Sequence, residues 1–186
     1  DLKGKIKTNI GGKTPELSIH KVNEELDIEI IYPSVVGFGF FDISELSLEI
    51  SIPRDIKASA RISTTSAKIE IKEIRIEELV AESVSGAIDV NNIESGSIEI
   101  KNTSGRCLVN DAVGTIHIKT VSGEALINLK ELNDDINISS VSGAVSLKVP
   151  EDSSFTFDLS SVSGKIENNF NAKVDVLAEE LNRLKY

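Results

Sequence analysis

The sequence predicts an all-β protein: a parallel β-helix, or β-solenoid, with about 19 residues per coil. Three observations predict this fold. A Ser-Gly pair recurs at nearly constant spacing, short segments of alternating apolar residues flank each pair in one register, and aromatic residues make up only 4% of the chain. Aliphatic side chains stacked in rows suit the narrow core of a solenoid better than bulky rings do.

The repeated pair marks one corner of each coil. Its copies are Ser85-Gly86, Ser104-Gly105, Ser122-Gly123, Ser142-Gly143 and Ser163-Gly164, with glycines 19, 18, 20 and 21 residues apart, and a degenerate copy at Ser66-Ala67. We interpret the glycine as a residue with positive φ, or as one that lets neighbouring turns approach closely. The serine is expected to bond to backbone within the turn or to the serine of the next coil.

Four apolar rows keep a fixed register with these pairs. Two residues after the glycine position stand Ile69, Ile88, Cys107, Ala125, Val145 and Ile166, and four after it stand Ile71, Val90, Val109, Ile127 and Leu147. Five residues before it stand Ile62, Ala81, Ile100, Ile118, Ile138 and Leu159, and seven before it stand Ala60, Leu79, Ile98, Ile116, Ile136 and Phe157. A period of two is that of a strand with one buried face. Successive coils are expected to pair in parallel, ~4.8 Å apart.

Both ends of the chain differ from these coils. Residues 1–52 hold alternating runs at Glu16–His20, Leu26–Ile30 and Leu46–Ile52, which predict strands that form either imperfect coils or an antiparallel lid. Residues 174–186 carry leucines at helical spacing, which predicts a short helix that caps the last coil. We therefore expect a single domain over 1–186, with regular coils from 53 to 170.

Composition limits the classes of partner. A net charge of −10 argues against binding to nucleic acid or to anionic lipid. The chain has no methionine, begins at Asp1 and contains no apolar run near the length that spans a bilayer. We expect an excised ectodomain that reaches a membrane only through an N-terminal anchor outside this sequence.

The residues that could carry chemistry have structural explanations. Cys107 stands alone and in an inward row, so it is expected to be a small buried hydrophobe rather than a nucleophile or metal ligand. His117 lies between two isoleucines of a strand, and it and His20 are expected at the surface. Asp134-Asp135 and Asp89 could hold a weak Ca²⁺ ion, but solvated turn residues are the preferred interpretation. We predict no cofactor and no metal.

The sequence also favours a non-catalytic protein. Some parallel β-helices cleave polysaccharides with acidic clusters on an outer face, often beside stacking aromatics. Here the outward positions of the middle coils, such as Arg106 and Leu108, do not form an acidic cluster, and the chain has 2 tyrosines and no tryptophan.

Two features are candidate interaction surfaces. The first is an outward apolar strip of Ala87, Leu108, Leu126 and Ala144, and the second is the segment 35–41, which contains Phe38, Phe40 and Phe41. Either could instead be covered by other parts of the fold. As an interaction site, each would contact a protein or another component of the cell envelope.

The apolar strand that ends in proline (Leu48–Pro53, again Leu147–Pro150), followed by Thr/Val-Ser-Gly-x-Ile-x-Val units, resembles a bacterial adhesin-domain family of unknown function. The resemblance implies a right-handed β-helical head domain, often anchored outside the membrane, and no catalytic residues. It favours an adhesin-like structural or interaction module on the extracellular face of the envelope. A polymerising intracellular scaffold and a carbohydrate-active enzyme remain the alternatives.

Overall fold

The computed structural model describes residues 2–7, 16–23, 25–31, 45–132, 134–150, 157–161 and 183–185. The chain divides into two compact units, Asp1–Ile52 and Pro53–Tyr186. The boundary between them lies where the repeat analysis places the first regular coil. That the two units form a single domain stays a prediction.

The unit Pro53–Tyr186 contains a parallel β-solenoid. Its strands are β5 (Ser59–Thr64), β6 (Ile69–Ser83), β7 (Ile88–Asn102), β8 (Cys107–Thr120), β9 (Ala125–Asn128), β10 (Ile136–Ser140), β11 (Val145–Lys148) and β12 (Phe157–Ser161). Neighbouring coils pair in the register that the repeat predicts, so that Ile88 lies between Ile69 and Cys107. The predicted fold class is confirmed.

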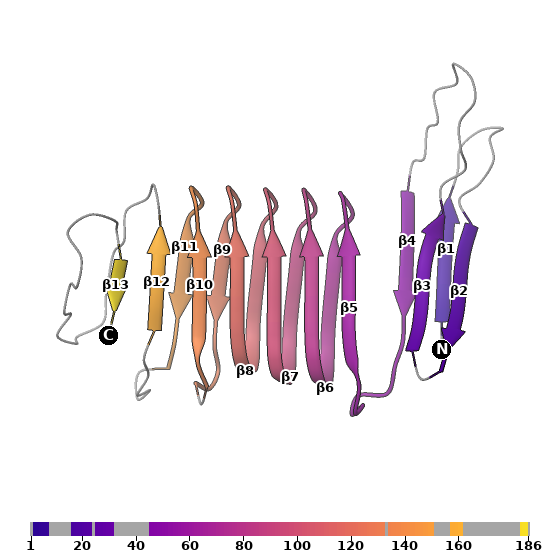
Figure 1. Cartoon of the computed structure of the whole chain (residues 1–186), viewed down its shortest axis with the longest axis horizontal. Helices are drawn as coiled ribbons and strands as arrows, with labels where there is room; N and C mark the ends of the chain where they lie inside the picture. The colour runs from indigo at the N-terminus through magenta and orange to yellow at the C-terminus, as the bar shows by residue number, and fades with distance from the viewer. Residues whose placement is uncertain are drawn as a thin grey trace, which may run out of the picture. The chain divides into compact units, whose positions relative to one another are not determined.

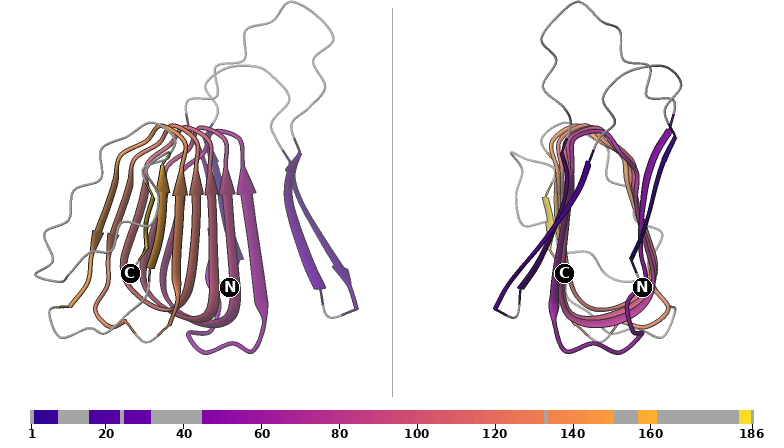
Figure 2. Two further views of the ribbon diagram at one scale, coloured as in Figure 1. Left: turned by 60° about the vertical axis from the view of Figure 1, so that its left-hand side comes forward. Right: turned by 90° about the vertical axis from the view of Figure 1, so that its right-hand side faces the viewer.

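Each coil has two straight faces (Figure 2). The front face consists of β5, the C-terminal parts of β6, β7 and β8, and then β10 and β12; the back face consists of the N-terminal parts of β6, β7 and β8, and then β9 and β11. In Figure 1 the chain rises through the front face, crosses to the back at the top and descends there while it advances to the left. The coil is therefore right-handed.

The predicted apolar rows form the core. Members that are at most 1% exposed are Leu79, Ala81, Ile88, Val90, Ile98, Ile100, Cys107, Val109, Ile116, Ile118, Ala125, Ile127 and Ile138. Burying an aliphatic side chain of this kind contributes ~1.5–3 kcal/mol relative to leaving it exposed. The side chains of the rows become more exposed toward the ends of the described coils, where Ile62 is 36% exposed and Val145 is only half-buried.

The repeat glycines allow neighbouring turns to touch. A Cβ atom on Gly105 would lie 2.1 Å from the carbonyl oxygen of Gly86, and one on Gly86 would lie 1.9 Å from that of Ala67. None of the described repeat glycines has a positive φ, so close approach is the correct one of the two expected reasons. Ala67 lies on the first coil of this unit, which explains why that turn tolerates a Cβ atom.

The residue three positions before each glycine closes the turn. The N–H of Gly105 donates to Asn102 Oδ1 at 2.7 Å, and Asn102 Nδ2 donates across to the carbonyl oxygen of Gly86 at 3.0 Å. The side-chain oxygens that accept in the same way on the other turns belong to Thr64, Ser83, Thr120 and Ser140. The serine of the pair bonds instead to the preceding coil, as Ser104 Oγ does to Val84 O at 3.3 Å.

The opposite edge of the coil is a tight corner within β6, β7 and β8. Glu73, Asn92 and Asp111 occupy equivalent places there, with φ of 53°, 54° and 52°. The shortest repeat is accommodated at this corner. The register of the pairing between β7 and β8 shifts there, and Gly114 has a φ of 125°. A Cβ atom at Gly114 would lie 1.7 Å from Ser95 O, so this position requires glycine.

The unit Asp1–Ile52 contains antiparallel strands. β1 (Leu2–Lys7) pairs with β4 (Glu45–Ile50), and β2 (Glu16–Val22) pairs with β3 (Glu25–Ile31) through a turn that places Asn23 at a φ of 57°. The three predicted strands are confirmed, and β1 was not predicted. Antiparallel pairing excludes these strands as imperfect parallel coils.

The C-terminal helix prediction is wrong for residues 183–185. These residues form β13 (Arg183–Lys185), which pairs antiparallel with β12 and places Leu184 beside Leu159. A strand can satisfy the open N–H and C=O groups along the edge of β12, whereas a helix cannot. Residues 174–182 lie outside the described residues. Within the described part of the chain, no helix is long and apolar enough to cross a membrane.

Candidate functional site

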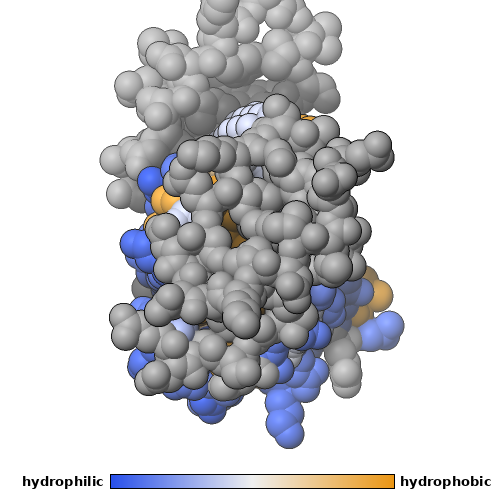
Figure 3. All heavy atoms as spheres, turned by 90° about the vertical axis from the view of Figure 1, so that its left-hand side faces the viewer, coloured by the Kyte–Doolittle hydropathy of each residue, from blue (hydrophilic) through white to orange (hydrophobic). Residues whose placement is uncertain are grey.

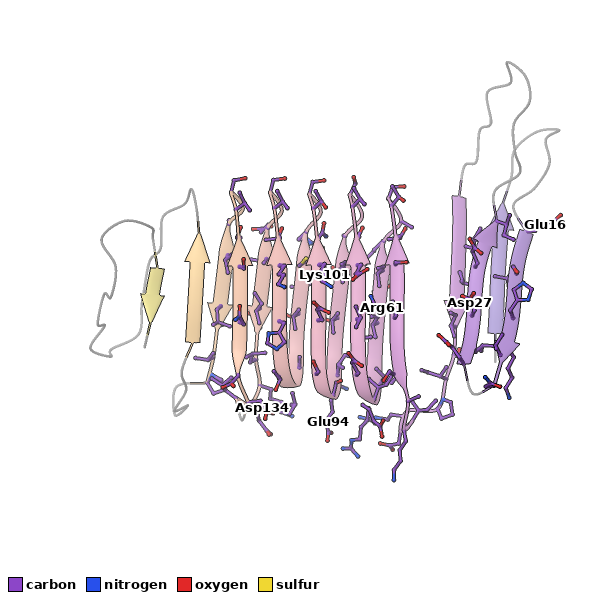
Figure 4. All side chains as sticks on the ribbon, viewed as in Figure 1. Glu16, Asp27, Arg61, Glu94, Lys101 and Asp134 are labelled. Carbon is purple, nitrogen blue, oxygen red and sulfur yellow. The ribbon has the colours of Figure 1, made fainter. Side chains whose placement is uncertain are left out.

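The front face carries a network of ion pairs across three coils. Glu82 accepts from Arg61 at 3.2 Å and from Lys101 at 3.1 Å, and Lys101 also contacts Glu99 at 2.9 Å. Figure 4 shows Arg61 and Lys101 on this face, on β5 and β7. The hydrogen bond to Glu99, followed by that to Glu82, raises the pKa of Lys101, and Lys101 in turn lowers the pKa of Glu99.

An open groove of about 540 Å³ crosses the coils between this network and the Ser-Gly turns. One side is formed by the last outward row of the front face: Ser63, Glu82, Lys101, Lys119 and Ser139. The other side is formed by the turn residues Val84, Thr103, Val121 and Val141, which we call the turn ridge. The valines of the ridge are 45–49% exposed. The sequence analysis missed this groove.

The back face carries the predicted apolar strip. Leu108 and Leu126 lie side by side on neighbouring coils, and both are half-buried, as is Ala87, while Ala144 is exposed. The structure therefore brings Leu108 and Leu126 together on an outer face. The segment with Phe38, Phe40 and Phe41 lies outside the described residues.

A buried carboxylate lies at the N-terminal end of this strip. Asp89 points to the outer face but is only 6% exposed, because Lys68 contacts it at 2.7 Å and Arg106 at 3.7 Å. Its Oδ1 atom has no hydrogen-bond partner. The hydrogen bond with Asp89 raises the pKa of Lys68. The expectation that Asp89 is a solvated turn residue is wrong, because long cationic side chains cover it.

The back face also carries an asparagine ladder that the sequence analysis missed. Asn110 Nδ2 donates to Asn91 Oδ1 at 2.9 Å, and Asn128 Nδ2 donates to Asn110 Oδ1 at 2.8 Å. The signal was present, since each asparagine follows its repeat glycine by five residues. These amides satisfy one another between coils and stabilise the stacking.

A second groove, of about 400 Å³, lies at the corner edge. Arg75 lines this groove. It connects the preceding and the following coil, because its guanidinium group pairs with Asp55 at 3.1 Å and with Glu94. The hydrogen bond with Glu94 is the main reason that the pKa of Arg75 is raised. Figure 4 shows Glu94 and Asp134 along this same edge.

The other chemically reactive residues are dispersed. Cys107 is buried, as predicted, and burial raises the pKa of its thiol to about 11, so it stays protonated at neutral pH. His117 is half-exposed on the front face, and His20 is exposed and bonded to Ser18 at 2.8 Å. In the part of the chain that the structure describes, no three His, Cys, Asp or Glu side chains are grouped to hold a metal.

Viewed from the end with β12 and β13, the described residues around the coils are mainly hydrophilic, and hydrophobic ones show in small separate patches (Figure 3). The family model described as Toastrack DUF4097 matches residues 11–184. No curated protein and no solved structure matches the chain. The match agrees with the predicted resemblance to a β-helical family of unknown function. The adhesin role and the membrane anchor stay predictions.

Proposed function

We propose that this chain, which belongs to the Toastrack family, is a non-catalytic interaction module displayed on the outer face of a bacterial cell envelope. The observation that carries the proposal is the arrangement of its outer side chains in straight rows along the coil axis. Leu108 and Leu126 are neighbours in one such row, and Lys101 and Lys119 are neighbours in another. Rows of this kind present a long surface to an extended partner rather than converging on one reacting atom.

The charge and the C-terminal end of the coil support the same proposal. A chain with a net charge of −10 is repelled by anionic lipid, which favours display away from the bilayer surface. The edge of β12 is occupied by β13, which disfavours the alternative of coils that polymerise end to end. The ligand class expected for the apolar strip is a protein or envelope component with an apolar contact surface.

The location is tested by adding protease to intact cells that produce the full-length protein. An envelope-displayed module is degraded without lysis, and protection until lysis would refute the location.

Binding is tested by mixing the purified chain with isolated envelopes. We expect Leu108→Ser with Leu126→Ser, or Phe41→Ser, to lower binding at least about tenfold with little change in melting temperature. Ser146→Ala, farther along the same outer row, is the matched control. Equal binding by all variants would refute both candidate surfaces.

A further inference from the structure

The back face is straight (Figure 2), and two neighbouring coils form its centre. The backbones of β8 and β9 pair there, and the N–H of Cys107 donates to the carbonyl oxygen of Glu124 at 2.7 Å, which extends the pairing by one residue. Arg106 therefore lies beside Glu124, just as Leu108 lies beside Leu126. The centre thus combines an apolar pair with one positive and one negative group.

These four side chains are accessible to a partner. The side chain of Arg106 is 51% exposed, and its ion pair with Asp89 is long, at 3.7 Å. Glu124 is exposed and forms no ion pair with another described residue. Leu108 and Leu126 point outward and are half-buried. A complementary partner has apolar groups opposite the leucines, an acid opposite Arg106 and a base opposite Glu124.

The spacing of the coils favours a β-sheet as this partner. Outer side chains on the back face repeat at the ~4.8 Å distance of paired strands, whereas side chains on one face of an extended peptide repeat every ~6.6 Å. A peptide laid along the coil axis would lose register within two coils. A second sheet keeps register because its strands have the same spacing, and two sheets pack face to face with their strands nearly aligned.

We propose that the back face binds the back face of a second copy of this chain, about a two-fold axis that runs parallel to the strands, between β8 and β9. The inference rests on the proposed function, since it names another copy as the partner of the apolar strip. Such an axis turns each outer row onto the same row of the partner and reverses the order of the coils. Leu108 then faces Leu126 of the partner subunit, and Arg106 faces Glu124 of the partner subunit. Each of these contacts forms twice.

The charges favour this axis over the other two-fold axis that joins the same faces. An axis along the coil, through the leucines, would keep the order of the coils. Asp89 and Glu70 would then each face their own equivalent in the partner subunit, which opposes like charges. The axis parallel to the strands avoids both contacts and forms two oppositely charged pairs.

Residues around the centre also suit this arrangement. Ala87 and Ala144, on the coils to either side, face each other across the contact, and their small side chains let the two sheets approach. Asn110 faces Asn128 of the partner subunit. Each of these two amides donates one N–H within its own ladder, so its second N–H can bond to the partner.

The single contact is expected to be weak. The strands of the back face belong to β6, β7, β8, β9 and β11, and five coils at ~4.8 Å each span about 24 Å. About five residues per coil at ~3.4 Å each span about 17 Å. The flat area of roughly 400 Å² lies below the ~800 Å² per partner of a standard stable interface. Dimers should therefore need a high protein concentration, or many copies displayed on one surface.

Sedimentation equilibrium of the purified full chain, at ~0.15 M salt to screen the net charge, tests the proposal. We expect the wild type to dimerise. Arg106→Glu alone and Glu124→Arg alone should each dimerise at least about tenfold more weakly, because like charges then face each other in both pairs. An equal mixture of these two variants should recover the wild-type affinity, since every charge in the mixed dimer again faces its opposite.

Two further variants serve as controls. Lys119→Glu, on the front face, changes the net charge as much as Arg106→Glu does and should leave dimerisation unchanged. Leu126→Ser leaves the charges as they are and should weaken dimerisation about tenfold with little change in melting temperature.

Three results would overturn the proposal. These are a mixture that dimerises no better than its components, a Leu126→Ser variant as strong as the wild type, and a wild-type chain that is still monomeric at ~1 mM. A monomeric chain that nevertheless binds isolated envelopes would refute the second copy and leave the proposed function standing. Protection from protease on intact cells would refute the proposed location without affecting the dimer.

Discussion

Replacing Gly105 with alanine tests the stacking of the turns most directly. The added Cβ atom would lie 2.1 Å from the carbonyl oxygen of Gly86, inside the ordinary contact distance by more than 1 Å. Both groups belong to backbones that are paired along the coil, so neither can move alone. The neighbouring turn must separate, which also strains the hydrogen bonds that Asn102 makes to Gly105 and Gly86.

The expected cost follows from these contacts. Inserting a methyl group into a packed core costs ~1–3 kcal/mol, and weakening one buried hydrogen bond adds ~1 kcal/mol. We therefore expect Gly105→Ala to lower the free energy of unfolding by about 2–4 kcal/mol. The opposite sign is expected if the turns do not touch. Gly105 has no positive φ, and in an unstrained site alanine stabilises by ~0.4–1 kcal/mol through the unfolded chain.

Urea unfolding followed by circular dichroism measures this difference. The matched control is Ala67→Gly on the first coil, where removal of a Cβ atom relieves no clash and should cost no more than about 1 kcal/mol. A Gly105→Ala variant as stable as the wild type, or more stable, would refute the close approach of the turns.

Other consequences concern the core, the thiol and the C-terminal edge. Ile118→Ala should cost ~2–5 kcal/mol in the same urea assay, because the side chain is fully buried between Ile100 and Ile138; a cost below 1 kcal/mol would contradict its place in the row. Native Cys107 should resist iodoacetamide at neutral pH and react once unfolded. Because its pKa rises from 9.0 to about 11 on folding, stability should fall as the pH increases above about 9, and a Cys107→Ala variant should lose that part of the dependence. Deleting residues 183–186 should free the edge of β12 and cause concentration-dependent light scattering; a monomeric truncated chain of unchanged stability would argue against edge protection by β13.

The register of the coils could be predicted from the sequence because each row repeats apolar residues at the equivalent position of many coils. One exception therefore does not hide the pattern. The inward row that contains Ile88 and Ala125 is recognisable even though one member, Cys107, differs from its neighbours in type. The closure of the turns escaped prediction for the opposite reason. Thr64, Ser83 and Asn102 each provide a side-chain oxygen at the equivalent position but differ in residue type. A search for the repeated Ser-Gly pair therefore does not find them.

The errors arose where distant contacts override local pattern. Leucines at helical spacing predicted a helix over 174–186, but the unpaired edge of β12 provides backbone partners that only a strand can use, and residues 183–185 take them. Asp89 lies on the outer face, beside Leu108 of the following coil. Its burial depends on Lys68 and Arg106, whose long side chains fold over it from neighbouring coils.

On the back face, the same spacing between coils applies to the inward row, which stabilises the fold, and to the outward row, which forms the surface. The inward row beginning at Ile69 stays apolar from coil to coil, while the adjacent outward row changes from Glu70 and Asp89 to Leu108 and Leu126. Pairing of the backbones fixes the separation of both rows, whatever side chains the outer row carries. Outer residues can therefore differ in charge and polarity without disturbing the core. An interaction surface built on this fold depends on which row is exposed and on how many coils repeat it.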